Sequence, residues 1–197
     1  MIKSYDFNNP EWHADFIYAR APHTRYNAKY GPAVCGVIKS EYNPEIDEHD
    51  YISVISREKY SVGTEIKTTC SFSGTGAPCL VFTNELPDDE DFPEYGLHFE
   101  VCIYKGGVNV WHIIPFPERI GRPIKPTKIY YETWDVNQDS VDCTVKFGYK
   151  KITVLIEGRE FTVEHEDFPT EFRVGFTSCE GPCSFSAFSI NSGEQDG

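Results

Sequence analysis

From end to end, apolar and polar residues alternate along this chain, and turn-forming residues interrupt the alternation at short intervals. Successive side chains of a β-strand point to opposite faces, so this two-residue period predicts strands with one buried face. No window keeps the three-to-four spacing of an amphipathic helix over several turns. The interruptions include Asn43-Pro44, Gly74-Thr75-Gly76, Gly106-Gly107, Asn137-Gln138-Asp139, Gly158 and Gly181-Pro182. We therefore predict an all-β, antiparallel fold.

The length of the chain suits one large β-domain. Single β-sandwiches often reach about 200 residues, and this chain has 197. Its 14 Phe and 12 Tyr residues against one Met are typical of pleated strands. Proline and glycine are spread along the chain instead of being concentrated in a linker. We therefore expect residues 1–197 to form a single two-sheet antiparallel β-sandwich.

The pattern also places the individual strands. The expected strands are Ser4–Phe7, His13–Tyr18, Ala33–Ile38, Tyr51–Ser56, Thr64–Ser73, Cys79–Thr83, Tyr95–Lys105, Val108–Ile114, Thr127–Val136, Val141–Tyr149, Ile152–Glu157, Glu160–Val163, Phe172–Ser178 and Phe185–Ile190.

A formal net charge of −13 limits the partners of this chain. Such a charge repels phosphate backbones and anionic lipids, which argues against nucleic acid and membrane partners. No segment approaches the roughly 20 apolar residues of a membrane span, and Met1–Trp12 lacks the apolar core of a signal peptide. We expect a cytoplasmic protein, and the oligomeric state is left open.

The cysteines and histidines show no recognisable site motif. An odd, scattered set of cysteines is not a disulfide framework, so we expect reduced thiols. Cys179 and Cys183 should flank a hairpin loop between the last two strands. The histidines have no paired spacing with cysteines or acids, which predicts no transition metal. The cysteines are Cys35, Cys70, Cys79, Cys102, Cys143, Cys179 and Cys183, and the histidines are His13, His23, His49, His98, His112 and His165.

One acidic segment could bind Ca²⁺. Residues Leu86–Pro93 place four acids between two prolines, and carboxylate oxygens are the ligands that Ca²⁺ prefers. The alternating Asp/Asn spacing and the glycine of a dedicated calcium loop are missing. We therefore expect an acidic loop and no cofactor, with Ca²⁺ as the alternative.

The double glycine Gly106-Gly107 predicts a two-residue hairpin turn, because glycine adopts positive φ angles readily. Lys105 would then face Val108, and Cys102 would face Trp111. The apolar face of this hairpin would carry Leu97, Phe99, Val101, Ile103, Val108 and Val110. The opposite face would carry His98, Glu100, Tyr104, Asn109 and Trp111.

Two assignments are open for the strand at residues 129–134. One alternating set is Tyr130, Glu132 and Trp134, and the other is Ile129, Tyr131 and Thr133. We expect the first set to face outward beside Trp111, because an unpaired carboxylate such as that of Glu132 is costly to bury.

The order of these elements resembles the concanavalin A-like superfamily of lectins, laminin G-like modules and laminarinase-type glucanases. The likeness is carried by Tyr5-Asp6-Phe7 with Trp12, by 96–101 leading into 107–111, by the hairpin 152–161, and by 172–176 with 185–190. It implies a jelly roll of two curved sheets with adjacent first and last strands. It also implies a concave face that holds a glycan in many members.

One acidic run is superficially similar to the glucanase signature. It extends from Glu45 to Asp50, but its last acid is Asp50 and it lies early in the chain. An exposed turn is the better interpretation.

The outward set predicts a carbohydrate-binding, lectin-like site. An exposed indole can stack on a sugar ring, and neighbouring amide and carboxylate groups can hydrogen-bond its hydroxyls. The candidate ligand-binding residues are His98, Glu100, Asn109, Trp111, Glu132 and Trp134.

Three alternatives stay open for this face. Glu100 and Glu132 could serve as the two carboxylates of a glycoside hydrolase or polysaccharide lyase. Loops could instead cover the sheet and bury the indoles, or the domain could be a non-catalytic protein-interaction module. No serine nucleophile elbow or phosphate-binding glycine loop is present. We therefore favour binding over catalysis.

Overall fold

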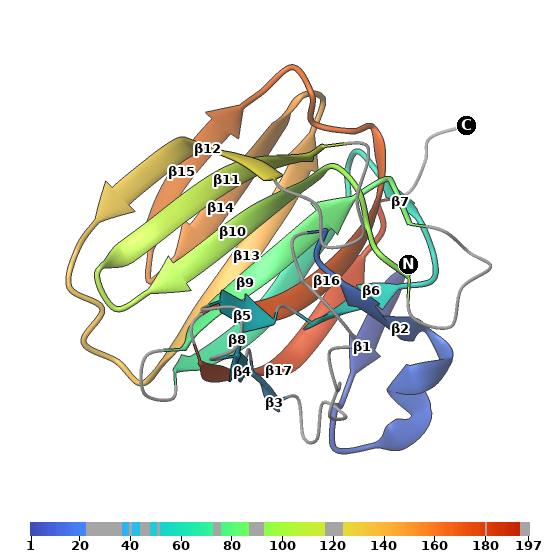
Figure 1. Ribbon diagram of the computed structural model, residues 1–197, viewed down its shortest axis with the longest axis horizontal. Helices are drawn as coiled ribbons and strands as arrows, with labels where there is room; N and C mark the ends of the chain where they lie inside the picture. Colours follow the sequence, from blue (N-terminus) through green and yellow to red (C-terminus); the bar gives the residue numbers. More distant parts are fainter. Residues whose placement is uncertain are drawn as a thin grey trace.

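Two antiparallel β-sheets pack face to face in the computed structural model, in the arrangement of a jelly-roll β-sandwich (Figure 1). The structure describes residues 1–22, 37–39, 41–43, 48–50, 52–72, 76–86, 93–116, 124–179 and 181–193, with the backbone alone for 37–39, 41–43, 48–50 and 182. Among these residues, no helix is long and apolar enough to cross a membrane.

Sheet A has seven strands and sheet B has eight. In spatial order, sheet A contains β1 (Ile2–Tyr5), β17 (Pro182–Asn191), β8 (Glu65–Phe72), β13 (Ser140–Gly148), β14 (Lys151–Ile156) and β15 (Arg159–Glu164), with β3 (Val37–Lys39) paired to β17. Sheet B contains β12 (Ile124–Thr133), β11 (Gly107–Pro115), β10 (His98–Tyr104), β9 (Ala77–Thr83), β16 (Glu171–Cys179), β6 (Ile52–Ser56) and β2 (Phe16–Arg20), with β7 (Tyr60–Ser61) paired to β16.

A two-stranded sheet of β4 (Glu41–Asn43) and β5 (Glu48–Asp50) completes the described strands. Part of the acidic run from Glu45 is therefore strand β5, whereas residues 45–47 lie outside the described part of the chain. The acidic segment considered for Ca²⁺ also lies mostly outside it, at residues 87–92. The adjacent first and last strands implied by the resemblance are confirmed, because β1 pairs with β17.

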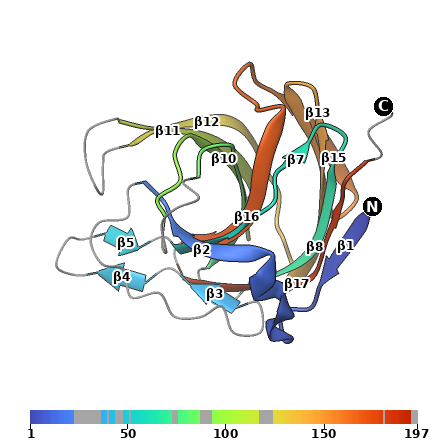
Figure 2. The same ribbon diagram turned by 90° about the vertical axis from the view of Figure 1, so that its right-hand side faces the viewer.

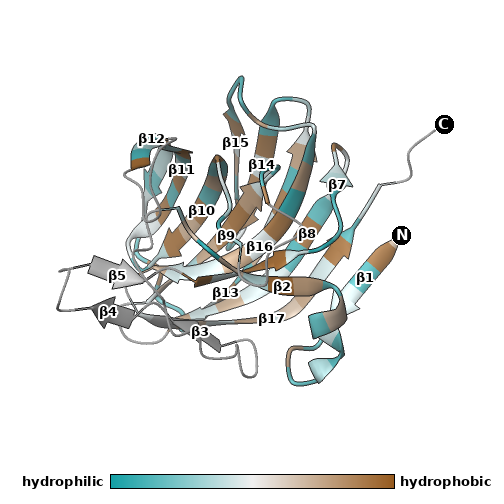
Figure 3. Ribbon diagram, turned by 45° about the vertical axis from the view of Figure 1, so that its right-hand side comes forward, coloured by the Kyte–Doolittle hydropathy of each residue, from teal (hydrophilic) through white to brown (hydrophobic). Residues whose placement is uncertain are grey.

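The core forms where the apolar residues of both sheets meet. Along β13, buried and exposed residues alternate strictly at first, as the two-residue period predicts. The same alternation appears as successive teal and brown segments along the strands in Figure 3. Phe82 and Phe99 of sheet B pack in one cluster with Ile66 and Val145 of sheet A, and each is fully buried or nearly so. We call this side of sheet B its inner face.

The outer face of sheet B is concave. In Figure 2, this sheet curves from β12 and β11 through β10 and β16 to β2, with its concave side turned away from β8 and β1 of sheet A. The fold therefore provides the kind of concave surface that the sequence resemblance implies.

The hairpin of β10 and β11 is shifted by two residues from the predicted register. Tyr104 pairs with Gly107, Cys102 with Asn109, and Glu100 with Trp111. Lys105 and Gly106 form the turn, and Gly107 is already part of β11 with φ +133°. The predicted pairing was wrong, but a shift of two residues keeps every side chain on its predicted face.

A β-bulge interrupts β12, and the residues after it face opposite to the prediction. The pairing steps from Val110↔Tyr130 to Trp111↔Lys128, which leaves one extra residue, Ile129, in β12. Ile129 and Tyr130 both pack against the inner core.

Residues after the bulge follow the new alternation. Glu132 lies opposite the buried Val108, whereas Tyr131 lies opposite Asn109 on the outer face. The expectation that Tyr130, Glu132 and Trp134 face outward with Trp111 was therefore wrong.

Two further predicted elements differ from the structure. The strand expected from His13 starts only at Phe16, because Pro10–Ala14 forms a 3-10 helix that is capped by Asn9 and buries Trp12. The last two strands, β16 and β17, belong to different sheets, so the loop between them is a crossover and not a hairpin. Cys179 and Cys183 lie at this crossover, where both carry thiols in this structure.

Candidate functional site

Four of the six predicted site residues lie together on the outer face of sheet B. His98 and Glu100 come from β10, and Asn109 and Trp111 come from β11. Glu100 and Trp111 are directly opposite each other, so the carboxylate and the indole are cross-strand neighbours. The structure thus assembles a carboxylate, an amide, an imidazole and an indole on one surface.

A pocket of about 190 Å³ opens beside Trp111 on this face. It is smaller than the roughly 300–1,000 Å³ of most small-molecule sites, so it suits one ring or one chain end. Among the described residues that line it, Glu100 is the only acid. The lining residues are Cys79, Glu100, Cys102, Trp111, Ile113, Ile124, Pro126, Thr177 and Cys179.

Trp111 is half-buried and rests on a small apolar cluster that includes Cys79 and Cys102. The ammonium of Lys128 lies 5.0 Å from its ring centroid and 5.7 Å from that of Tyr131. Tyr131 is 67% exposed and shares the outer face, so it adds an exposed aromatic ring to this surface. Sequence reasoning placed it inward, because the alternating set that contains Glu132 was expected to face outward.

Asn109, directly opposite Tyr131 and two residues before Trp111, has an unsatisfied side-chain acceptor. Its side-chain oxygen Oδ1 is buried and has no hydrogen-bond partner among the described residues. The position pairs with Cys102 on one side and Tyr131 on the other. A buried acceptor without a donor costs free energy, and a ligand hydroxyl would remove that cost.

His98 and Glu100 form a hydrogen-bonded pair at the floor of this face. The buried His98 ring lies with Nδ1 2.8 Å from the carbonyl oxygen of Gly96, so Nδ1 must donate there. Its Nε2 lies 3.2 Å from Oε1 of Glu100, a contact that needs a second proton on one of the two atoms. The Glu100 side chain is 16% exposed, so the pair still reaches the surface.

Thiols form much of the pocket wall. Cys79 and Cys102 are direct cross-strand neighbours, and Cys179 lines the same pocket. A hydrogen bond with Cys102 lowers the pKa of Cys79, but burial, Glu100 and the neighbouring thiols together outweigh it and raise the pKa of Cys79 to about 12. This thiol therefore stays neutral near pH 7 and presents a weakly polar surface.

Glu132 and Trp134, the other two predicted site residues, lie at the edge between the two sheets. Arg159 of β15 places Nη1 3.3 Å from Oε1 of Glu132, and its guanidinium carbon is 5.1 Å from the Trp134 ring centroid. Tyr130 donates a hydrogen bond of 2.8 Å to Glu132, and the indole of Trp134 donates one of 2.9 Å to Glu157. These residues join β12 to sheet A and do not share a face with Glu100.

The rest of the outer face is partly covered. Ala19, Ile55, Val81 and Tyr95 are fully buried and form a second apolar cluster there. The hydroxyl groups of Tyr95 and Ser53 hydrogen-bond at 2.9 Å, which satisfies the phenol inside this cluster. The outer face is thus covered at the end of the sheet near Tyr95, which matches one of the alternatives left open by the sequence. At the Trp111 end the pocket is open.

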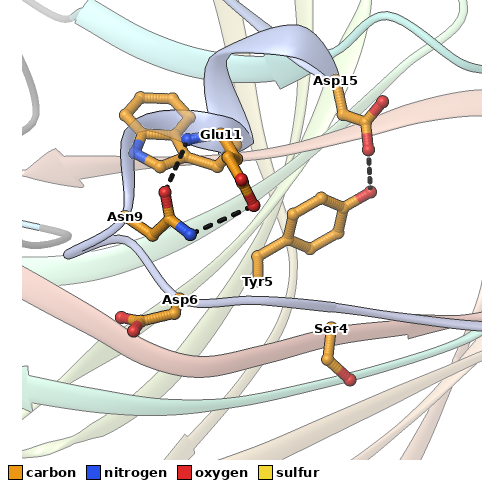
Figure 4. Close-up of a pocket in the computed structure, with 7 residues that line it drawn as sticks. Ser4, Tyr5, Asp6, Asn9, Glu11 and Asp15 are labelled. Atoms are coloured by element: carbon orange, nitrogen blue, oxygen red, sulfur yellow. Dashed lines mark hydrogen bonds between the residues drawn. The ribbon is translucent and has the colours of Figure 1, made fainter.

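A second hollow of about 280 Å³ lies in the N-terminal segment, away from the predicted residues (Figure 4). Its polar groups bond to each other: Tyr5 donates to Asp15 at 3.0 Å, and Asn9 bonds both the backbone and the carboxylate of Glu11 at 3.1 Å. The Tyr5–Asp15 bond holds the end of the 3-10 helix against β1, and the Asn9–Glu11 bonds cap its start, so we assign this hollow a structural role.

No protein-family model matches the sequence, and no curated protein matches it. Solved structures do match its fold. The carbohydrate-binding module CBM66 from Bacillus subtilis has a TM-score of 0.53 and 12% identity, and the match covers 80% of this chain and 96% of that one.

Two enzymes show a similar likeness. A Crh5 transglycosylase in complex with NAG has a TM-score of 0.59 and 13% identity, covering 98% of this chain and 84% of that one. An inactivated β-agarase B in complex with agaro-octaose has a TM-score of 0.58 and 11% identity, covering 96% and 93%. The fold is therefore a concanavalin A-like jelly roll, as the sequence resemblance implies.

Proposed function

We propose that this protein binds a carbohydrate on the outer face of sheet B, at the pocket beside Trp111. The observation that carries the proposal is the combination of a supported indole with the carboxylate of Glu100 directly opposite it. The indole would stack on one sugar ring, and Glu100 would accept hydrogen bonds from its hydroxyls. Two structures with a similar fold were solved in complex with NAG and with agaro-octaose, which supports this class of ligand.

Asn109 and Tyr131 would extend the site beyond the pocket. A turn of the Asn109 side chain would expose its orphan oxygen to a ligand hydroxyl, and the exposed ring of Tyr131 can stack on a second sugar. The pocket itself suits one residue of the glycan. We therefore propose a short, neutral oligosaccharide as the ligand, with one ring in the pocket and one over Tyr131.

Binding without hydrolysis is the form of the proposal that the geometry supports. Glycoside hydrolysis generally needs two carboxyl groups facing the same glycosidic bond. The anticipated partner of Glu100 was Glu132, but Glu132 lies on the inner face and is paired with Arg159. Among the described residues lining the pocket, Glu100 has no second carboxylate beside it.

The proposal is tested by a glycan array, followed by calorimetric titration of the strongest neutral oligosaccharide. Trp111→Ala should weaken binding by about tenfold or more, which corresponds to about 1.4 kcal/mol. The matched control is Tyr149→Ala, which removes an aromatic residue that is 67% exposed outside this site. Equal affinities of the two variants, or no glycan bound at millimolar concentration, would refute the site.

A reducing-sugar assay with the same oligosaccharide separates binding from catalysis. No product should accumulate over long incubation. Product that forms with the natural sequence and disappears with Glu100→Gln would replace the binding function with a hydrolytic one.

A further inference from the structure

A cluster of possible metal ligands lies on the inner side of sheet B, on the opposite face from Trp111. It consists of His112 from β11 and of His165 and Asp167 from the segment between β15 and β16. One ligand atom from each residue lies within 4.8 Å of the other two. This segment, orange in Figure 1, carries the chain from sheet A to sheet B.

His112 is the fixed member of the cluster. Its side chain is only 5% exposed, and its ring stacks on Phe99 with centroids 4.6 Å apart and an interplanar angle of 10°. Its Nε2 is buried and has no hydrogen-bond partner among the described residues. Asp167 Oδ2 is 3.6 Å away, which is too long for a hydrogen bond. A polar atom in this state costs free energy unless something binds it.

The other two ligands are held in a well-defined turn. The backbone N–H of His165 donates to the carbonyl of Lys150 at 3.1 Å, and that of Phe168 donates to the carbonyl of His165 at 3.2 Å. Phe168 is buried with its ring centroid 4.2 Å from that of Phe99, which anchors the turn beside His112. The ligands are therefore preordered before any ion arrives.

The carboxylate and the second imidazole point into the same space. Asp167 Oδ2 lies 4.0 Å from Nδ1 of His165, and this nitrogen accepts a hydrogen bond of 3.2 Å from the backbone N–H of Asp167. The Nδ1 lone pair is therefore directed into the turn, and a bound cation would take the place of that N–H.

Two imidazoles and one carboxylate are a donor set for a borderline transition metal, and not for Ca²⁺. Bond lengths near 2.0–2.2 Å in a tetrahedral site place ligand atoms about 3.4 Å apart. The three atoms now lie within 4.8 Å of one another, so ion binding would draw the exposed Asp167 and the turn toward His112. The fourth position would hold water. Access is open, because Asp167 is 54% exposed and His165 borders a hollow of about 510 Å³.

The charges around the cluster do not by themselves attract a cation. Glu164 and Glu166 line the same hollow as His165, but so do Lys150 and Lys151, and Glu166 is ion-paired with Lys150. Lys125 near His112 also opposes a cation, so binding depends on the three ligand atoms themselves.

We propose that His112, His165 and Asp167 bind one Zn²⁺ ion that ties the β15–β16 segment to β11. No transition metal was expected, because the histidines show no paired spacing in the sequence. His112 and His165 are far apart in the chain, and only the fold brings them together. This site is independent of the proposed carbohydrate site, since it lies across the sheet from Trp111.

The test is titration of the chelator-treated full chain with Co²⁺ under reducing conditions, followed by displacement with Zn²⁺. One equivalent of Co²⁺ should produce d–d absorption bands that Zn²⁺ removes, and one equivalent of Zn²⁺ should raise the melting temperature. Asp167→Asn, at an exposed position that should not disturb folding, should abolish both effects, as should His165→Gln. Glu166→Gln is the matched control and should keep both.

The variants also distinguish this site from the cysteines. If thiols held the Zn²⁺ instead, the Asp167→Asn variant would bind Zn²⁺ as tightly as the natural chain does. That result, or the absence of binding at micromolar Zn²⁺, would overturn the proposal.

Discussion

Gly107 allows β12 to approach β11 closely at the end of the hairpin. Its φ is +133°, and an added Cβ would lie 2.1 Å from the carbonyl oxygen of Glu132 and 2.9 Å from Cα of Thr133. Both are backbone atoms, so relief would require β12 to move. We predict that Gly107→Ala lowers the free energy of unfolding by about 2 to 4 kcal/mol, measured by urea denaturation.

Gly158 provides the control for this residue. It has φ +78° with no atom within 4 Å of an added Cβ, so alanine there has only the cost of the left-handed conformation. That cost is about 1 to 2 kcal/mol. A loss for Gly107→Ala that does not exceed the loss for Gly158→Ala would show that β12 does not restrict this position.

Glu132 shows where residue-level reasoning from the sequence stops. An unpaired carboxylate does avoid the interior, but Glu132 is paired, and one of its partners comes from the other sheet. Arg159 and Tyr130 bind its two oxygens, and only the packing of the sheets brings Arg159 there. The predicted facing failed because the compensating cation could not be seen in the local pattern.

At the scale of the strand, alternation predicted β10 and β11 better than β12. In β10 and β11 the predicted pairing was off by two residues, but the predicted faces were still correct, because side chains alternate with a period of two. In β12, the extra residue at Ile129 reverses the facing of all later positions. Four of the six site residues were therefore placed on the correct face, and the two beyond the bulge were not.

Because Trp134 faces the core and Trp111 faces outward, we expect their replacement by alanine to affect stability and glycan binding differently. Trp134 packs against the core and bonds Glu157, so Trp134→Ala should lower the free energy of unfolding by about 1 to 3 kcal/mol. It should leave glycan affinity unchanged. Trp111→Ala should weaken glycan binding with a smaller loss of stability, because Trp111 lies over a small cluster on the outer face.

Urea denaturation and calorimetric titration of both variants check this pair of expectations. Loss of glycan binding in the Trp134→Ala variant, at a temperature where it is folded, would restore the original assignment of β12 to the binding face.

At the scale of the molecule, the two-sheet architecture followed from the sequence because strand alternation and turn residues are local signals. The meeting of His112 and His165 did not, since it depends on the crossover between the sheets. Long-range sites of this kind have no spacing that a single sequence can reveal.

Buried thiols in sheet A make the stability of the whole molecule sensitive to alkaline pH. Burial raises the pKa of Cys143 in β13 and of Cys183 in β17 from the ordinary 9.0 to about 12. Above pH 9 the unfolded chain loses these protons while the folded chain keeps them. The unfolded state then binds fewer protons, so the free energy of unfolding must fall as pH rises.

Each thiol should contribute a loss of about 1.4 kcal/mol per pH unit between about pH 9 and pH 12, and none below pH 9. Urea denaturation from about pH 8 to 11 measures the slope. Cys143→Ala removes one of these groups and leaves the other titrating residues in place, so its slope should be shallower by about 1.4 kcal/mol per pH unit. Parallel slopes for the two proteins would mean that Cys143 reaches solvent before the sandwich unfolds, because a thiol that ionises equally in both states cannot change the balance between them.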